Sequence, residues 1–295
     1  MHRSIWGGLA AAVLLAAGAA QAESILFVGN SFTFGALSPV KPYKSDTVTD
    51  LNAQWIGGVP ALFKAFTAQS GLDYQVSLET APGMGFDFHY DQKLATLAKP
   101  WGTVILQGYS TLDAQKPGDP AKLVKYTGLL ADAFLKQNPQ ARLYLVATWS
   151  RADLTYPPGK PWSGKPIEAM AQDIRAGYDQ AKAAVPAIRA VLPVGEAWTR
   201  AMHEGVADPN PYDGVSFGQL DLWSWDQYHA SAYGYYLEAL VIFGGVAGRD
   251  PRSLGDHEAS AADLGFSPAQ TKVLQLTAYE ELAAQGLLAA ASPTP

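Results

Sequence analysis

The stretch Ile25-Leu26-Phe27-Val28-Gly29-Asn30-Ser31-Phe32-Thr33 joins four consecutive apolar residues to an abrupt Gly-Asn-Ser turn. Such an apolar run before a turn predicts a strand buried on both faces, as in a parallel sheet. A strand of this kind delivers the next residues to the carboxyl edge of the sheet, where α/β folds bind their ligands. Gly29 permits a sharp turn from which the Ser31 hydroxyl and N–H can face one cavity. Ser31 is therefore a candidate nucleophile, and a polar turn without a catalytic role is the alternative.

Outward from this strand, strand-like and helical patterns alternate along the chain. Strands are expected at 25–28, 74–78, 103–107, 142–148 and 188–194, and helices from 59, at 122–137, 168–185, 195–204 and 233–246, and from Pro268 with Ser267 as N-cap. This alternation predicts a parallel sheet covered by helices on both faces. The five strands fit one doubly wound α/β domain over residues 23–290. Residues 35–58 are expected to form a polar loop beside the site, and 291–295 a disordered tail.

The N-terminus has the pattern of a secretory signal peptide. His2 and Arg3 precede an apolar run from Ile5 to Ala20, and Ala20-Gln21-Ala22 has the small-x-small form of a cleavage site. We therefore expect a signal peptide over residues 1–22 and a secreted or periplasmic protein that begins at Glu23. No other segment is long and apolar enough to suggest a transmembrane helix once the signal is removed.

The composition excludes several classes of partner. The formal net charge of −6 becomes −7 when Arg3 leaves with the signal, and no basic run is present, so a nucleic-acid partner is not expected. The chain has no cysteine, which excludes disulfides and thiolate metal sites. With 48% hydrophobic residues, a chain of this length can bury a large core without disulfides.

A serine hydroxyl becomes a good nucleophile only when a base takes its proton, so a histidine oriented by a carboxylate is required. Asp226-Gln227-Tyr228-His229 offers this pair, because a carboxylate three residues before the imidazole can accept the Nδ1 proton and leave Nε2 free. The pair follows the last expected strand and precedes a helix, which returns it to the same edge as Ser31. A surface pair or a metal site is the alternative for Asp-x-x-His taken alone.

Donors for an oxyanion are expected on the loops after the first three strands. The candidates are the N–H of Ser31, a glycine N–H from Gly83 or Gly85, and the side-chain amide of Gln107. The alternative for Gln107 is an amide that only supports the loop backbone at the end of its strand.

Together these residues resemble the SGNH (GDSL-type) hydrolase superfamily. The first block of that family matches Gly29-Asn30-Ser31 with Asn in place of Asp, its second-block glycine falls at Gly83, and its fifth block matches Asp226 and His229. Gln107 stands where the family has an asparagine in its third block. The resemblance covers about residues 25–246 and points to a divergent bacterial branch.

The resemblance implies a flavodoxin-like, three-layer α/β/α fold and hydrolysis of esters through an acyl-serine intermediate, without metal or cofactor. Ser31 would attack, His229 would act as base and then acid, and Asp226 would orient the imidazole. Acetyl or other short-chain esters, including those of carbohydrates, are the expected substrates. Possible substrate-binding residues are Asn30, His89, Tyr109, Trp225 and Tyr228, and Trp162 and Trp223 are further aromatic candidates for stacking against sugars. For His89, a role in capping the following helix is the alternative.

Two rival functions belong to other classes. The first is a ligand- or carbohydrate-binding protein that keeps the fold without turnover. The second is a metal-dependent hydrolase that uses His89, Asp226 and His229.

Overall fold

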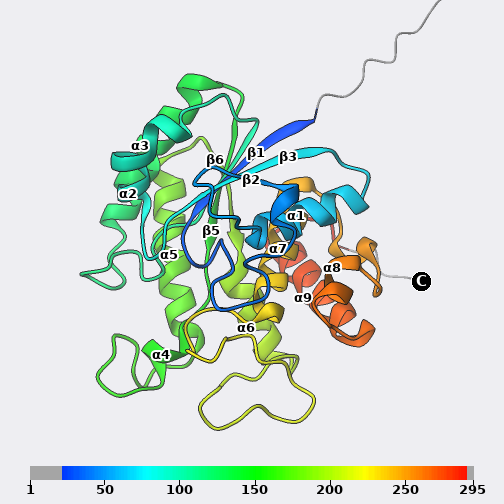
Figure 1. Cartoon of the computed structure of the whole chain (residues 1–295). Coiled ribbons are helices and arrows are strands. Elements are labelled where there is room, and N and C mark those ends of the chain that lie inside the picture. The colour runs from blue at the N-terminus through cyan, green and yellow to red at the C-terminus, as the bar shows by residue number, and fades with distance from the viewer. Residues whose placement is uncertain (1–21, 291–295) are drawn as a thin grey trace, which may run out of the picture.

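The strand that follows the N-terminal segment lies in the middle of a parallel sheet. In the computed structural model, which describes residues 22–290, this strand is β1 (Glu23–Gly29). The sheet has the order β2-β3-β1-β4-β5-β6 (Figure 1). The other strands are β2 (Thr49–Asp50), β3 (Tyr74–Thr80), β4 (Thr103–Leu106), β5 (Arg142–Ala147) and β6 (Ile188–Pro193). The expected tail and all but the last residue of the expected signal peptide lie outside the described residues.

The prediction of five strands is wrong by one, since the sheet has six. The additional strand β2 falls inside the segment 35–58, which the sequence indicated to be a loop. It is only two residues long and pairs at the sheet's edge with Ser77 and Leu78 of β3. A two-residue polar strand has too few residues to show an alternating pattern, so no sequence signal marks it.

Helices cover both faces of the sheet (Figure 1). They are α1 (Gly58–Gln69), α2 (Phe86–Leu97), α3 (Ala121–Gln137), α4 (Ala152–Thr155), α5 (Glu168–Ala184), α6 (Val194–His203), α7 (Ala232–Ala247), α8 (Ala259–Asp263) and α9 (Pro268–Ala284), with short 3₁₀ turns at Ser45–Thr47 and Pro251–Leu254. In Figure 1, α2, α3 and α5 lie to the left of the sheet, and α1, α7, α8 and α9 lie to the right. The expected start of the last helix is confirmed, since Ser267 caps α9 in a capping box with Gln270.

Successive residues of β1 enter two different hydrophobic clusters. Ile25 and Phe27 join the cluster formed with α1, α7 and α9, whereas Leu26 and Val28 join the cluster formed with α2, α3 and α5. All four are fully buried. Because side chains alternate across a strand, a strand covered on both faces must be apolar at every position, which is the pattern of its sequence. None of the helices in residues 22–290 has the length and apolar character of a membrane span.

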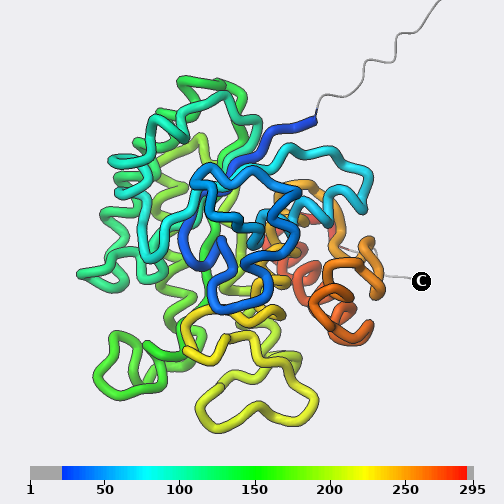
Figure 2. Tube along the Cα trace, viewed as in Figure 1, coloured from blue at the N-terminus to red at the C-terminus, as the bar shows by residue number. Residues whose placement is uncertain are grey.

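The loops after the strands bring together segments that are far apart in the chain. The segment after β1 and the segment before α7 lie side by side in the tube of Figure 2, in blue and yellow. A hydrogen bond from Ser224 Oγ to Leu37 O (3.2 Å) joins them, and the Tyr235 hydroxyl of α7 donates to Ser31 O (3.2 Å). The fold thus brings the candidate serine and the candidate Asp-x-x-His segment to one edge of the sheet.

Candidate active site

The turn that carries Ser31 begins at a position where only glycine fits. A Cβ placed on Gly29 would lie 2.1 Å from Thr33 Oγ1 and 2.9 Å from Gln107 Oε1. Both distances are shorter than the non-bonded contacts that a Cβ atom makes in folded proteins. The absence of a side chain at Gly29 therefore lets the strand end and the serine turn begin within one residue.

Asn30 ties three strand-end loops together. Its side-chain oxygen accepts from Phe32 N–H (3.1 Å), and its Nδ2 donates to Met84 O (2.9 Å) and to Gly108 O (3.0 Å). These bonds join the loop after β1 to the loops after β3 and β4. The sequence suggested Asn30 as a possible substrate-binding residue. The residue is only 3% exposed, and both of its amide hydrogens are used in hydrogen bonds to the neighbouring loops.

Gln107 is buried beneath the same turn. Its Oε1 accepts from Asn30 N–H (3.1 Å) and from the Thr33 hydroxyl (3.0 Å), and its Nε2 donates to Gly108 O. These contacts give Gln107 the loop-supporting role that was the alternative from the sequence. One hydrogen of its amide remains without a partner among residues 22–290, so the oxyanion role stays a prediction.

An aromatic column supports the serine turn from below. The ring of Phe32, the residue after Ser31, stacks on Trp149 with centroids 4.0 Å apart, and Trp149 stacks on Trp198 with centroids 4.6 Å apart. The three rings are fully buried. Offset or parallel stacking of buried rings adds about 0.5–1.5 kcal/mol per pair beyond the burial of area. The column fixes the position of Phe32 and thereby of the backbone at Ser31.

The Asp226–His229 segment is a closed turn. Ser224 N–H donates to His229 O (2.7 Å), and Trp223 and Ala230 form an antiparallel bridge at its base. Inside the turn, Asp226 Oδ1 accepts from the backbone N–H of Tyr228 (3.1 Å) and of His229 (3.0 Å). This is the way an aspartate stabilises a turn with its own side chain.

The other oxygen of the same carboxylate orients the imidazole. Asp226 Oδ2 lies 2.6 Å from His229 Nδ1. Burial raises the pKa of Asp226, but the hydrogen bonds from the His229 ring and from the two backbone N–H groups outweigh it, so the net pKa lies below the usual range. Asp226 therefore stays ionised and holds a proton on Nδ1, which leaves Nε2 as the basic nitrogen.

One edge of the His229 ring is in contact with the serine turn. Its centroid lies 5.8 Å from that of Phe32, in an edge-on contact. Ser31 Oγ and His229 Nε2 have no hydrogen-bond partner among residues 22–290, and neither atom is sealed from solvent. The two groups thus share one edge of the sheet without a direct hydrogen bond. Catalytic contacts in ligand-free sites are often longer than in the complex with substrate.

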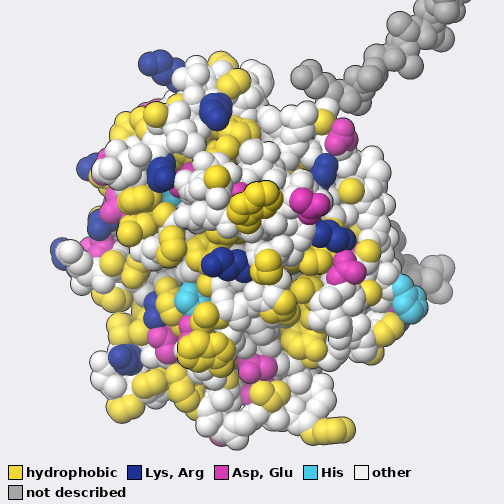
Figure 3. Space-filling view, viewed as in Figure 1, with side chains coloured by type: hydrophobic (Ala, Val, Ile, Leu, Met, Phe, Trp, Pro, Cys, Tyr) yellow, Lys and Arg dark blue, Asp and Glu magenta, His cyan; other side chains and the backbone are white. Residues whose placement is uncertain are grey.

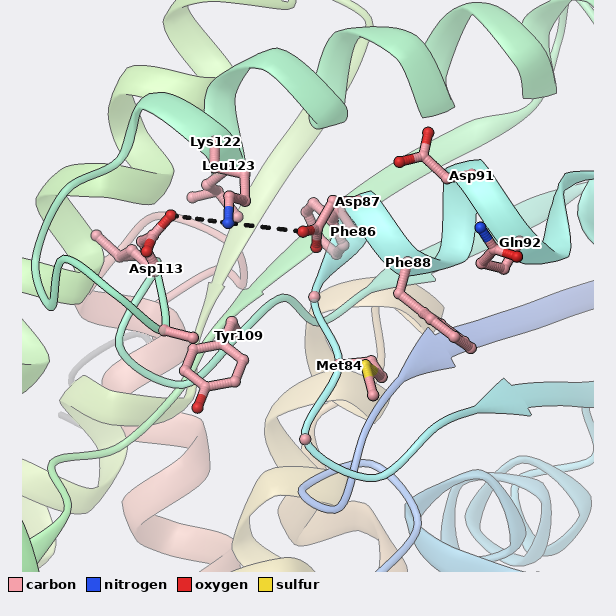
Figure 4. Close-up of a pocket in the computed structure, with 14 residues that line it drawn as sticks. Met84, Phe86, Asp87, Phe88, Asp91, Gln92, Tyr109, Asp113, Lys122 and Leu123 are labelled. Atoms are coloured by element: carbon pink, nitrogen blue, oxygen red, sulfur yellow. Dashed lines mark ion pairs between the residues drawn. The ribbon is translucent and has the colours of Figure 1, made fainter.

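The turn between β3 and α2 presents a second set of backbone donors. Gly83 has φ +67°, a left-handed conformation that favours glycine, and it lies beside the exposed Met84. Neither Ser31 N–H nor Gly83 N–H donates a hydrogen bond within residues 22–290. This turn also forms one wall of a cavity of about 350 Å³, and Tyr109 is another residue that lines the cavity (Figure 4).

Of the aromatic candidates from the sequence, Trp225 and Tyr228 lie on the turn that carries Asp226, whereas Trp162 and Trp223 lie in the core. Trp225 is 77% exposed beside the Asp226 turn, and Tyr228 carries the Arg151 guanidinium 3.5 Å over its ring. Trp162 and Trp223 are buried in the core, where they donate to Asp173 and to Ser150 O, so their suggested stacking against sugars is wrong. Composition alone does not distinguish a core tryptophan from a surface one. Figure 3 shows apolar side chains spread widely over one face of the molecule.

His89 does not line the cavity. It lies within α2, is fully buried, and places Nδ1 2.5 Å from Glu79 Oε2. Among residues 22–290, no group of three or more His, Asp or Glu side chains is arranged to hold a metal ion. The residues named for the metal alternative, His89, Asp226 and His229, accordingly share no centre in the described part of the chain.

Comparisons with known proteins place the fold. No protein-family model matches the chain, and no curated protein matches its sequence. A crystal structure of a DUF4886 family protein from Bacteroides uniformis is similar, with a TM-score of 0.62 and 16% identity over 90% of this chain and 96% of the other. A candidate GDSL-like lipase from Parabacteroides merdae gives a TM-score of 0.52 and 15% identity over 77% of this chain and 95% of the other. The chain therefore has an SGNH-like α/β fold.

Proposed function

We propose that this protein is an exported serine hydrolase of the SGNH type, which cleaves short-chain carboxylic esters through an acyl-Ser31 intermediate. The observation that carries the proposal is the 2.6 Å contact between Asp226 Oδ2 and His229 Nδ1, with the imidazole packed on the residue next to Ser31. A carboxylate, an imidazole and a serine at one sheet edge are the three groups that acyl transfer needs.

The roles follow from the chemistry of these groups. His229 Nε2 takes the proton of the Ser31 hydroxyl as Oγ attacks the ester carbonyl carbon, and Asp226 stabilises the imidazolium that forms. The C–O bond to the alcohol then breaks, and His229 returns the proton to the leaving oxygen. Water activated by the same imidazole hydrolyses the acyl-enzyme and restores Ser31.

Charge on the carbonyl oxygen develops only in the transition state, so its donors must be in place beforehand. The free N–H groups of Ser31 and Gly83 are the first candidates, because no acceptor within residues 22–290 uses them. The remaining amide hydrogen of Gln107 is the third. Loss of one such donor typically costs about 10²–10³-fold in turnover, which makes Gln107→Ala a test of the third donor.

The test of the function is covalent trapping. A fluorophosphonate probe is expected to add one adduct to wild-type protein at Ser31 and none to Ser31→Ala, and p-nitrophenyl acetate is expected to be hydrolysed only by the wild type. Hydrolysis that resists the probe but stops with a chelator would replace the serine mechanism with the metal-dependent alternative.

A binding protein without turnover is the second candidate. It is favoured by one observation, the lack of a hydrogen bond between Ser31 and His229 among residues 22–290. Failure of the folded wild type to react with the probe and with any ester would support it.

Export is a separate part of the proposal. Mass spectrometry of the natural protein is expected to find a chain that begins at Glu23, and retention of Met1 in a soluble form would contradict it.

A further inference from the structure

The turn that carries Asp226 and His229 has a strained residue at its centre. Gln227 has φ +57°, in the left-handed region that is costly for a residue with a long side chain. Its Oε1 is also sealed from solvent and has no hydrogen-bond partner among residues 22–290. Such a conformation persists only where the surrounding structure holds it, so contacts from outside the turn decide how firmly the imidazole is placed.

The segment after β5 provides these outside contacts. The backbone N–H of Asp153 donates to Gln227 O (3.1 Å), and Trp149 Nε1 donates to Tyr228 O (3.2 Å). Two successive carbonyl groups of the turn are thus bonded to the same short segment. Arg151 lies between the two donors and is the N-cap residue of α4.

The Arg151 guanidinium uses its edge and its face at the same time. Its Nε and Nη2 donate to the two oxygens of Asp153 (3.0 and 2.7 Å), and its Nη1 donates to the Ser110 hydroxyl (3.3 Å) on the loop after β4. Its central carbon lies 3.5 Å from the centre of the Tyr228 ring. The Tyr228 ring in turn lies beside the imidazole of His229, with centroids 4.1 Å apart. Arg151 therefore reaches the imidazole through Tyr228.

The same contacts argue against a direct role of Arg151 on an anionic substrate. The bidentate contact with Asp153 neutralises its charge, and its side chain is only 12% exposed. A planar guanidinium can hold a carboxylate through its edge while it covers an aromatic ring with its face. The ammonium of a lysine is a point charge that cannot do both.

We propose that Arg151 is a positioning residue, which clamps the Tyr228 ring and thereby holds the strained turn in the conformation in which His229 accepts the Ser31 proton. The clamp joins three segments, the loop after β4, the segment after β5 and the turn before α7. This inference rests on the proposed function, because it takes His229 as the base. The placement of the turn can nevertheless be measured without turnover.

A second arginine with the same contacts supplies a matched control. Arg252 donates from Nε and Nη2 to the two oxygens of Asp250 (3.0 and 2.7 Å), and its central carbon lies 3.4 Å from the centre of the Tyr279 ring. Arg252 follows α7 in the chain, and Tyr279 lies on α9, to the right of the sheet in Figure 1. Arg252→Ala removes the same kind of contact outside the candidate active site.

The kinetic experiment measures kcat and KM separately on p-nitrophenyl acetate. Arg151→Ala is expected to lower kcat about 10²-fold, the effect of a displacement of about 1 Å at a reacting group, with KM unchanged. Arg151→Lys keeps the charge without the planar fork and is expected to lose about tenfold in kcat. Arg252→Ala should leave both constants unchanged. The inference is overturned if folded Arg151→Lys has the wild-type kcat, or if either change at Arg151 raises KM alone.

The structural experiment needs no turnover. Since the Trp149 indole N–H donates to Tyr228 O, its exchange with solvent deuterium, followed by NMR, reports how often the turn opens. Exchange is expected to be at least about tenfold faster in Arg151→Ala and Arg151→Lys than in the wild type and Arg252→Ala. If no ester is hydrolysed but this pattern holds, the proposed function fails and the clamp stands. An exchange rate in both Arg151 variants equal to that of the wild type would overturn the clamp and leave the proposed function untouched.

Discussion

Residues 22–290 contain two carboxylate–histidine pairs with short contacts of nearly the same length and very different surroundings. Asp226 Oδ2 and His229 Nδ1 are 2.6 Å apart, and Glu79 Oε2 and His89 Nδ1 are 2.5 Å apart. The side chains of the first pair are 19% and 13% exposed, whereas those of the second are fully buried. His89 Nε2 is sealed without a partner in the described part of the chain, so no substrate can reach it. Contact with solvent, more than the geometry of the pair, separates a candidate base from a histidine with a structural role.

The buried pair has a different consequence for the site. Glu79 is the penultimate residue of β3 and His89 lies in the first turn of α2, so their contact connects the two sides of the turn that carries Gly83. Asn52 Nδ2 adds a bond to Glu79 Oε1 (3.1 Å), and Lys93 Nζ approaches the same oxygen at 3.9 Å. We infer that the second pair supports the turn, whereas the first pair belongs to the proposed catalytic site.

The largest expected effect separates the two pairs by activity. His229→Ala and Ser31→Ala should each lower kcat/KM on p-nitrophenyl acetate by about 10⁶-fold, and the double variant should be hardly worse, because members of a triad act as a unit. The midpoint of thermal unfolding should stay near that of the wild type. His257→Ala, which alters an 84% exposed histidine, is the matched control. Additive losses in the double variant would show that the two residues act independently.

The next effect comes from the carboxylate of the first pair. Asp226→Asn keeps the nucleophile and the base but favours the wrong imidazole tautomer, so activity should fall by about 10⁴-fold, less than for His229→Ala. Steady-state kinetics on the same ester measures it. A loss equal to that of His229→Ala, together with a lower unfolding midpoint, would mean that Asp226 serves the turn more than the imidazole.

Changes in the buried pair should appear in stability instead. His89→Ala leaves the Glu79 carboxylate buried without its main partner, and breaking such a pair costs about 3–5 kcal/mol. Urea unfolding measures this loss, again with His257→Ala as the control. If His89→Ala retained full stability and lost turnover in the folded protein, His89 would belong to the chemistry, and the comparison between the pairs would collapse.

The smallest expected effect is on the loss of folding stability at acid pH. Burial raises the pKa of Glu79, but the hydrogen bond and charge of His89, with Asn52 and Lys93, outweigh it and leave the pKa below its usual value. A carboxyl group with a lowered pKa in the folded state contributes stability above its unfolded pKa of about 4.3, and the contribution is lost as the pH falls through the folded pKa.

Urea midpoints measured from pH 6 to pH 3 test this dependence. The decline in stability with acid should be shallower in Glu79→Gln than in the wild type, since the amide cannot ionise. Asp226→Asn should flatten it less, because water reaches that pair and screens it. A wild-type profile that is already flat below pH 5 would contradict the role assigned to Glu79.

Local patterns made the first pair predictable and concealed the second. Asp226 and His229 are three residues apart, so spacing alone suggested their contact. Glu79 and His89 lie ten residues apart, and the helix that His89 was expected to cap could be given no range, since only Phe86, His89 and Leu97 of α2 are buried. The apolar run of β1 marked the centre of the sheet, and the strand ends predicted which loops would meet. The two-residue β2, the burial of Trp162 and Trp223, and the contact of Arg151 with Tyr228 depend on tertiary contacts that no sequence period encodes.

The aromatic column beneath Ser31 couples the unfolding of the site to the unfolding of the core. Phe32, Trp149 and Trp198 connect the serine turn to the segment after β5 and to helix α6 in one uninterrupted stack. The turn cannot loosen while these rings remain stacked, because its own residue is the first of them. Heat inactivation should then be a single cooperative event, in which hydrolysis and the near-ultraviolet circular dichroism of the stacked indoles vanish at the same temperature.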